Sequence, residues 1–157
     1  MTERINYAEH GKDALKAIYG LEVYLHKSSI EPQLLHLIKY RVSQINGCAY
    51  CLDMHSKDLR AAGETEQRLY VLDAWREAPF YSDRERAALE WAEALTLVTD
   101  GHVPDEVFEI ASKQFSEKEL IDLTMAVVTI NSWNRISIAF RTTPGTYQPG
   151  QFSTATK

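Results

Sequence analysis

Helical periodicity is the sequence feature that most limits what this chain can fold into. Between Pro32 and Gly47, apolar residues recur every three or four positions, which places them on one side of a helix. These residues are Leu34, Leu35, Ile38, Val42 and Ile45. Pro32 suits a first helical turn, and Asn46-Gly47 ends the helix because both residues tolerate a left-handed backbone. No segment alternates apolar and polar residues for long enough to form a strand, so the sequence predicts an all-α fold with six or seven helices.

Boundary signals place the other helices. Ser82-Asp83-Arg84-Glu85 and Ser116-Glu117-Lys118-Glu119 have the form of capping boxes, which open helices. The expected helices cover residues 11–27, 32–46, 48–63, 65–75, 82–101, 104–114 and 120–140, the last of them apolar enough to be buried on most sides. Residues 142–157 are rich in Thr, Pro and Gly. We therefore predict a helical domain over 1–141 and a flexible C-terminal tail over 142–157, which could also reach a neighbouring subunit.

Composition excludes several classes of function. The chain has 157 residues, of which 45% are hydrophobic and 25% charged, as in a soluble single domain. A net charge of -5 argues against a nucleic-acid partner. No apolar run is long enough to span a membrane, and no secretory signal is apparent at the N-terminus, which predicts a cytoplasmic protein. Structural disulfides are rare in that compartment, so paired cysteines there favour metal binding or catalysis.

Both cysteines of the chain lie in the stretch "SQINGCAYCLDMHS", residues 43–56. If a helix begins after Gly47, Cys48 and Cys51 lie one turn apart on one side of it, and His55 follows on the same side. The N-terminus of a helix favours thiolate over thiol. A neighbouring histidine could accept a proton from a thiol or donate one to a leaving oxygen.

Three interpretations fit this pattern. Two thiols with a base could reduce a peroxide: one thiolate becomes a sulfenic acid and the second thiol condenses with it to a disulfide. The cysteines could instead form half of a zinc site, or they could simply pack in the core.

A longer resemblance favours the first interpretation. The stretches "SQINGCAYCLDMHSKDLRAAGETEQRLYVLDAWRE", "FYSDRERAALEWAEALT" and "INSWNRISIAF" resemble, in order along residues 30–140, the alkyl hydroperoxidase D (AhpD)-like branch of the carboxymuconolactone decarboxylase superfamily. The resemblance implies an AhpD-like helical bundle that assembles as a homo-oligomer, a trimer or hexamer. It also implies a thiol-dependent peroxidase without haem, flavin or metal. Its partners would be a hydroperoxide substrate and a dithiol reductant, lipoyl-type or thioredoxin-like.

The resemblance also implies residue roles. Cys51 would attack the peroxide, and Cys48 would resolve the sulfenic acid and, as the more exposed thiol, meet the reductant. The helix-terminus argument alone favours Cys48 as the more activated thiol. The family histidine falls on His55, and the position of the family glutamate, twelve residues before the first cysteine, holds His36.

His36 opens further alternatives. It could relay a proton with an altered pH dependence, another carboxylate such as Glu22 or Glu31 could replace the family glutamate, or the peroxidase activity could be weak. Together with Cys48, Cys51 and His55, it also forms a two-cysteine, two-histidine set of zinc-ligand types, although the spacing is tight for a tetrahedral ion.

Other polar residues receive structural interpretations. Asn131 and Asn134 share a helical face and could reach the thiol pocket, but we favour a role in tying helices together. Asp53 and Asp58 are expected to face solvent or a neighbouring subunit, and His26 is expected at the surface.

Two competing functions remain. One is a non-enzymatic redox- or zinc-responsive oligomeric module that uses the same cysteines and histidines. The other is a lactone decarboxylase, which the CxxC motif disfavours because that chemistry requires no dithiol.

Overall fold

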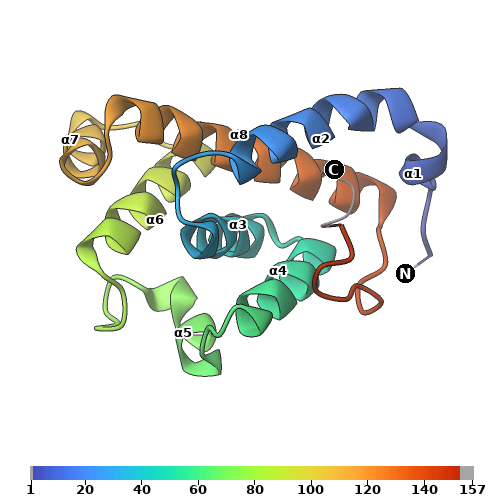
Figure 1. Ribbon diagram of the computed structural model, residues 1–157, viewed down its shortest axis with the longest axis horizontal. Coiled ribbons are helices and arrows are strands. Elements are labelled where there is room, and N and C mark those ends of the chain that lie inside the picture. The colour runs from blue at the N-terminus through green and yellow to red at the C-terminus, as the bar shows by residue number, and fades with distance from the viewer. Residues whose placement is uncertain (1, 153–157) are drawn as a thin grey trace.

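The computed structural model describes residues 2–152, which form helices and loops without a strand (Figure 1). The helices are α1 (Tyr7–His10), α2 (Lys12–His26), α3 (Pro32–Asn46), α4 (Ala49–Ala61), α5 (Glu66–Tyr70), the 3-10 helix η1 (Leu72–Ala74), α6 (Asp83–Thr96), α7 (Asp105–Gln114) and α8 (Glu117–Phe140). The predicted all-α fold is confirmed. No helix within 2–152 is long and apolar enough to cross a membrane.

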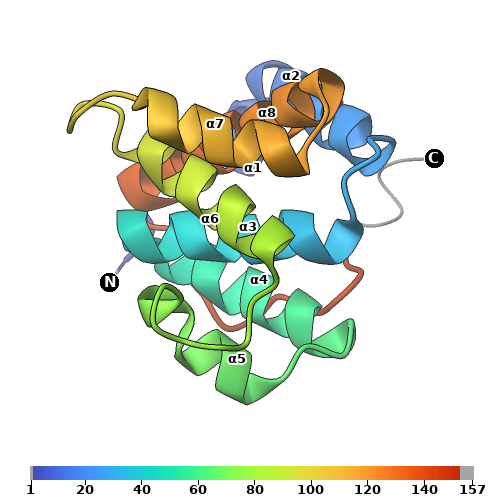
Figure 2. The same cartoon turned by 90° about the vertical axis from the view of Figure 1, so that its left-hand side faces the viewer.

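Helix α3 is the centre of the structure and packs against α4, α6 and α8. Its apolar face is closed to solvent, since Leu37, Ile38 and Val42 are each 0–1% exposed. Figures 1 and 2 show α2 and α8 on one side of α3 and α4 on the other. This arrangement brings segments that are distant in sequence around the N-terminal end of α4.

The predicted boundary between α3 and α4 is confirmed. Gly47 adopts a left-handed conformation with φ of 67°, and its N–H and that of Cys48 donate to the carbonyls of Gln44 and Ser43. Gly suits this position because it has no Cβ to clash. The capping boxes at Ser82 and Ser116 are confirmed as well.

Other boundaries differ from the prediction. Helix α1 was not expected, although Asn6 caps it by accepting a hydrogen bond from the Glu9 N–H, and it brings the α-helices among the described residues to eight. Helix α6 ends at Thr96 rather than at the expected Gly101. The residues after Thr96 include two β-branched residues and Asp100, which have low helix propensity. The expected helix 65–75 breaks at Val71 into α5 and η1.

Helix α8 is less buried than predicted. Ile121, Val128 and Ile138 are 46–61% exposed, so one stripe of this apolar helix faces outward. The opposite stripe carries Leu123 and Ile130, which are fully buried in the core.

The segment after α8 folds back onto α4. The Lys57 ammonium donates to the carbonyls of Gly145 and Tyr147, and the Gly145 N–H donates to Asp53. Tyr147 is only 4% exposed. Residues 153–157 of the predicted tail lie outside the described residues, and the flexibility of 142–157 stays a prediction.

Candidate active site

The turn at Gly47 positions the two thiols. Cys48 is the N-cap of α4 and Cys51 lies in its first turn, with the two sulfurs 2.7 Å apart and both cysteines free. Each cysteine is 1% exposed. The expectation that Cys48 is the more exposed thiol is therefore wrong for the described chain, because the cap turns its side chain inward, towards Asn134 and Ser137 of α8.

The environment of the pair favours one thiolate. The hydrogen bond with the Cys51 thiol lowers the pKa of Cys48 to about 7, against the opposing effect of burial and with help from the Cys51 N–H, Asn134 and Ser137. The same hydrogen bond and burial raise the pKa of Cys51 well above its ordinary value. The two groups titrate as a pair, in which one sulfur is ionised and the other keeps its proton and donates it.

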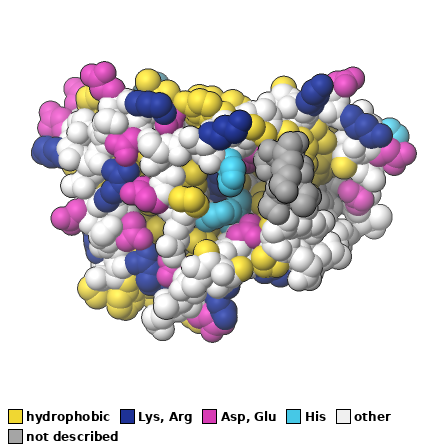
Figure 3. Space-filling model, viewed as in Figure 1, with side chains coloured by type: hydrophobic (Ala, Val, Ile, Leu, Met, Phe, Trp, Pro, Cys, Tyr) yellow, Lys and Arg dark blue, Asp and Glu magenta, His cyan; other side chains and the backbone are white. Residues whose placement is uncertain are grey.

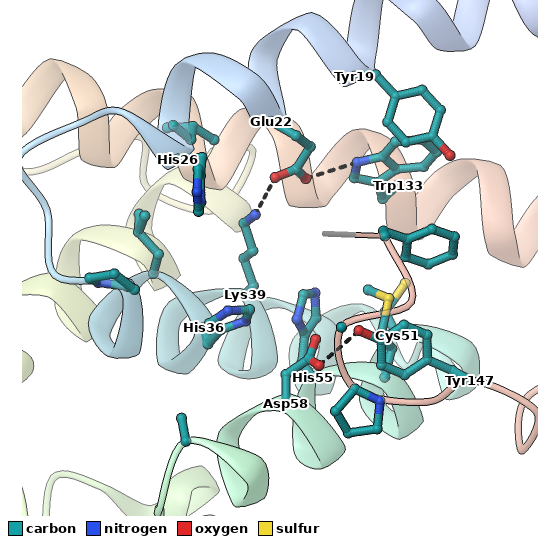
Figure 4. Close-up of a pocket in the computed structure, with 18 of the residues that line it drawn as sticks. Tyr19, Glu22, His26, His36, Lys39, Cys51, His55, Asp58, Trp133 and Tyr147 are labelled. Atoms are coloured by element: carbon teal, nitrogen blue, oxygen red, sulfur yellow. Dashed lines mark hydrogen bonds and ion pairs between the residues drawn. The ribbon is translucent and has the colours of Figure 1, made fainter. Parts of the chain in front are cut away.

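A cavity of about 640 Å³ opens beside the pair. Its wall comes from α2, α3, α4, α8 and the segment 147–152, and Cys51 lines it whereas Cys48 does not. Tyr19, Trp133 and Tyr147 give one side of the cavity an aromatic surface (Figure 4). Cys51 is thus the thiol that a molecule in the cavity would meet.

His36 and His55 meet in this cavity, with their ring centroids 5.8 Å apart. His55 is 4% exposed, and neither of its ring nitrogens has a hydrogen-bond partner among the described residues; the same holds for Nδ1 of His36. Burial, reinforced by the Lys39 charge, lowers the pKa of both imidazoles, and that of His55 falls well below its ordinary value. Histidine side chains are visible near the centre of the face in Figure 3.

Asp58 is the cavity residue that the sequence interpretation misplaced. It was expected to face solvent or a neighbouring subunit, but it lines the cavity, and donor atoms of His36, His55 and Asp58 lie within 4.8 Å of one another. The Tyr147 hydroxyl donates to Asp58 over 2.8 Å. The i, i+3 spacing from His55 could have placed Asp58 on the same helix face.

The two carboxylates suggested as substitutes for the family glutamate differ in position. Glu22 lines the cavity, pairs with the Lys39 ammonium at 2.5 Å and accepts a hydrogen bond from the Trp133 indole at 3.0 Å (Figure 4). Glu31 instead pairs with Arg84 and does not line the cavity. His26, predicted at the surface, is exposed at the rim of the cavity.

Asn131 and Asn134 of α8 connect neighbouring helices through hydrogen bonds, which is the role that the sequence favoured. The Asn46 amide donates to both Asn131 and Asn134, and the Asn134 amide donates to Ser43. Asn134 is fully buried and also lowers the pKa of the thiols. Its side chain therefore joins α3, α8 and the dithiol in one polar network.

Comparison with known proteins identifies the family of this chain. The sequence model of the carboxymuconolactone decarboxylase family matches residues 11–94. The chain belongs to this family. The uncharacterized protein YdfG of Bacillus subtilis is 48% identical over 139 residues, which is 88% of this chain and 95% of YdfG. The uncharacterized protein YnjA of Escherichia coli is 34% identical over 64% of this chain and 55% of its own length.

Solved structures confirm the AhpD-like helical fold. A protein of unknown function from Agrobacterium tumefaciens, described as a candidate antioxidant defence protein AhpD, superposes with a TM-score of 0.89 at 42% identity, over 93% of this chain and all of that one. The debrominase Bmp8 superposes with a TM-score of 0.74 at 21% identity, over 88% of this chain and 74% of its own, which shows the fold alone. The fold thus also occurs in an enzyme named as a debrominase.

Proposed function

We propose that this family member is a thiol-dependent peroxidase that cycles through a Cys48–Cys51 disulfide. The observation that carries the proposal is a pair of free cysteines with sulfurs 2.7 Å apart, one of which lines a cavity. Two thiols at this separation supply the two electrons that reduce an O–O bond, so no further cofactor is required.

The proposed attack occurs at Cys51, because this thiol faces the cavity. The Cys51 sulfur forms a bond to the terminal oxygen of the hydroperoxide, the O–O bond breaks, and Cys51 becomes a sulfenic acid while an alcohol leaves. The proton of the Cys51 thiol passes through His55, four residues along α4, to the departing oxygen as the O–O bond breaks. Because burial lowers the pKa of His55, the imidazole hands this proton on rather than keeping it, with His36 beside it as a relay.

Resolution then occurs at Cys48. Its thiolate attacks the Cys51 sulfur, the S–S bond forms, and the S–OH bond breaks; the departing hydroxide becomes water with the proton that Cys48 lost on ionisation. An external dithiol, lipoyl-type or thioredoxin-like, restores both thiols by exchange and becomes a disulfide itself. Since both cysteines are buried in the described chain, we expect α4 to open locally for this step, within a homo-oligomeric assembly.

The test is a thiol count. Reduced protein mixed with an equal amount of cumene hydroperoxide should lose both thiols, whereas Cys48→Ser should accumulate a sulfenic acid at Cys51 that a cyclic diketone traps. Trapping at Cys48 in Cys51→Ser would reverse the roles. Persistence of both thiols in folded wild-type protein would refute the peroxidase, and oxidation that changes the oligomeric state without turnover would favour a redox-responsive module.

The role of position 36 is tested separately. Steady-state peroxide turnover with dihydrolipoamide should change its pH profile in His36→Glu, because a carboxylate replaces an imidazole beside His55. An identical rate and profile would remove His36 from the proposed relay.

A further inference from the structure

A buried imidazole, a half-buried imidazole and a half-buried carboxylate lie close together in the cavity. Donor atoms of His36, His55 and Asp58 all lie within 4.8 Å of one another, and the side chains come from the facing helices α3 and α4 (Figure 4). The cysteine sulfurs do not belong to this group among the described residues. The set therefore differs from the two-cysteine, two-histidine zinc set that the sequence suggested.

The histidines lack the partners that buried imidazoles normally have. Both ring nitrogens of His55 and Nδ1 of His36 are buried without a hydrogen-bond partner among residues 2–152. A buried polar atom left unpaired costs about 1–3 kcal/mol, so such atoms usually serve a ligand or a bound species. Each neutral imidazole has one nitrogen with a lone pair, so the two histidines beside the Asp58 carboxylate can offer three donor atoms to a cation.

We propose that His36, His55 and Asp58 bind a first-row divalent transition-metal ion. Imidazole nitrogen and carboxylate oxygen are the donors that Zn²⁺, Fe²⁺ and Co²⁺ share, whereas Mg²⁺ and Ca²⁺ prefer oxygen alone. Ligands of one such ion lie about 3–4 Å apart, given metal–ligand bonds of about 2.0–2.2 Å. The three side chains thus need to close by roughly an ångström.

The groups around His36, His55 and Asp58 also favour a bound cation. The Tyr147 hydroxyl donates to Oδ1 of Asp58, which orients the carboxylate as outer hydrogen bonds do at known metal sites. The Lys39 ammonium would repel a cation, but Glu22 pairs with it at 2.5 Å and offsets its charge. Three protein ligands leave further coordination positions open to the cavity, as in catalytic rather than structural sites.

The ion would use the nitrogens that carry protons in the proposed peroxidase. A bound metal is then expected to slow thiol-dependent turnover. Only this expectation rests on the proposed function. Metal binding itself does not require the thiols, so it is tested on a variant that lacks them.

The experiment is a Co²⁺ titration of chelator-treated protein, followed by visible absorption. Wild type and Cys48→Ala/Cys51→Ala should bind one ion per chain with weak d–d bands and without the intense sulfur charge-transfer band, and Zn²⁺ should displace the ion. Asp58→Asn and His36→Gln should weaken binding at least tenfold, and Tyr147→Phe about tenfold. His26→Gln, at the cavity rim, is the matched control and should bind as wild type does.

Three outcomes would overturn the proposal. They are no saturable binding in wild type, unchanged binding in both Asp58→Asn and His36→Gln when circular dichroism shows them folded, and loss of binding in the cysteine-free variant. The last outcome would move the site to the thiols. Thiol oxidation by peroxide in the metal-free protein is measured independently, so failure of this site leaves the peroxidase proposal standing.

Discussion

The acidity of the dithiol gives a prediction that can be worked through in numbers. The pKa of Cys48 is lowered to about 7, compared with about 8.5 for an unperturbed thiol. At about pH 7 the thiolate fraction then rises from about 3% to about half, roughly 16-fold. A lower pKa also weakens the nucleophile, with a Brønsted coefficient of about 0.4–0.5, so the net gain in exchange rate is about three- to fourfold.

The perturbation is Cys51→Ala. It removes the hydrogen bond that is the largest cause of the lowered Cys48 pKa and leaves the opposing effect of burial. The variant should therefore have a higher Cys48 pKa. In wild type the Cys48 thiolate should form as the pH rises through about 7, and in the variant only near or above about pH 8.5.

The assay is thiolate absorbance in the ultraviolet as a function of pH, with the double cysteine variant subtracted to remove tyrosine. Wild type should show one thiolate per chain in the first step and the second only at much higher pH. Cys48→Ala is the matched control: the remaining Cys51 stays buried and should titrate above the first wild-type step. Two thiols that titrate together near their ordinary pKa, or an unchanged midpoint in Cys51→Ala, would refute the reasoning.

Three further predictions concern stability. Glu93 is buried and accepts hydrogen bonds from two guanidinium groups and an indole, so Glu93→Gln should cost about 3 kcal/mol and lower Tm by about 6–12 °C in a thermal melt; a loss under about 1 kcal/mol would contradict the pairing. Tyr147→Phe removes a hydrogen bond to the Asp58 carboxylate that is worth about 1.5 kcal/mol. In hydrogen-exchange measurements, the backbone amides of 145–150 should therefore exchange about tenfold faster, while those of α3 stay unchanged. Equal exchange rates in variant and wild type would show that this bond does not hold the segment. Ser116→Ala removes the α8 cap and should cost about 1 kcal/mol in denaturant unfolding, with an unchanged midpoint counting against the capping box.

Local signals predicted the parts of the site that lie close in sequence. The Asn46-Gly47 stop, the N-terminal placement of the thiols on α4 and His55 one turn later depend on backbone preferences and on a period of 3.6 residues. The resemblance to the AhpD-like branch likewise depended on residues that can be read directly along the chain. These features needed no knowledge of how the helices pack.

Long-range packing decided the remaining features. Sequence periodicity gives the face of a helix but not what covers it. Asp58 was therefore expected to face solvent or a neighbouring subunit, whereas the segment around Tyr147 returns across α4 and closes that side. The exposure of Cys48 was misjudged for the same reason, since α8 supplies the side chains that bury it.

The sequence alone determined an all-helical chain with a dithiol at a helix N-terminus, because helix formation and capping act over a few residues. Only the tertiary structure decided that Cys51 rather than Cys48 faces the cavity, and that His36 meets His55 and Asp58 there. The physical reason is that burial, lost hydrogen-bond partners and shifted pKa values arise from atoms far apart in the chain, which only the packing of α3 against α4 and α8 brings together.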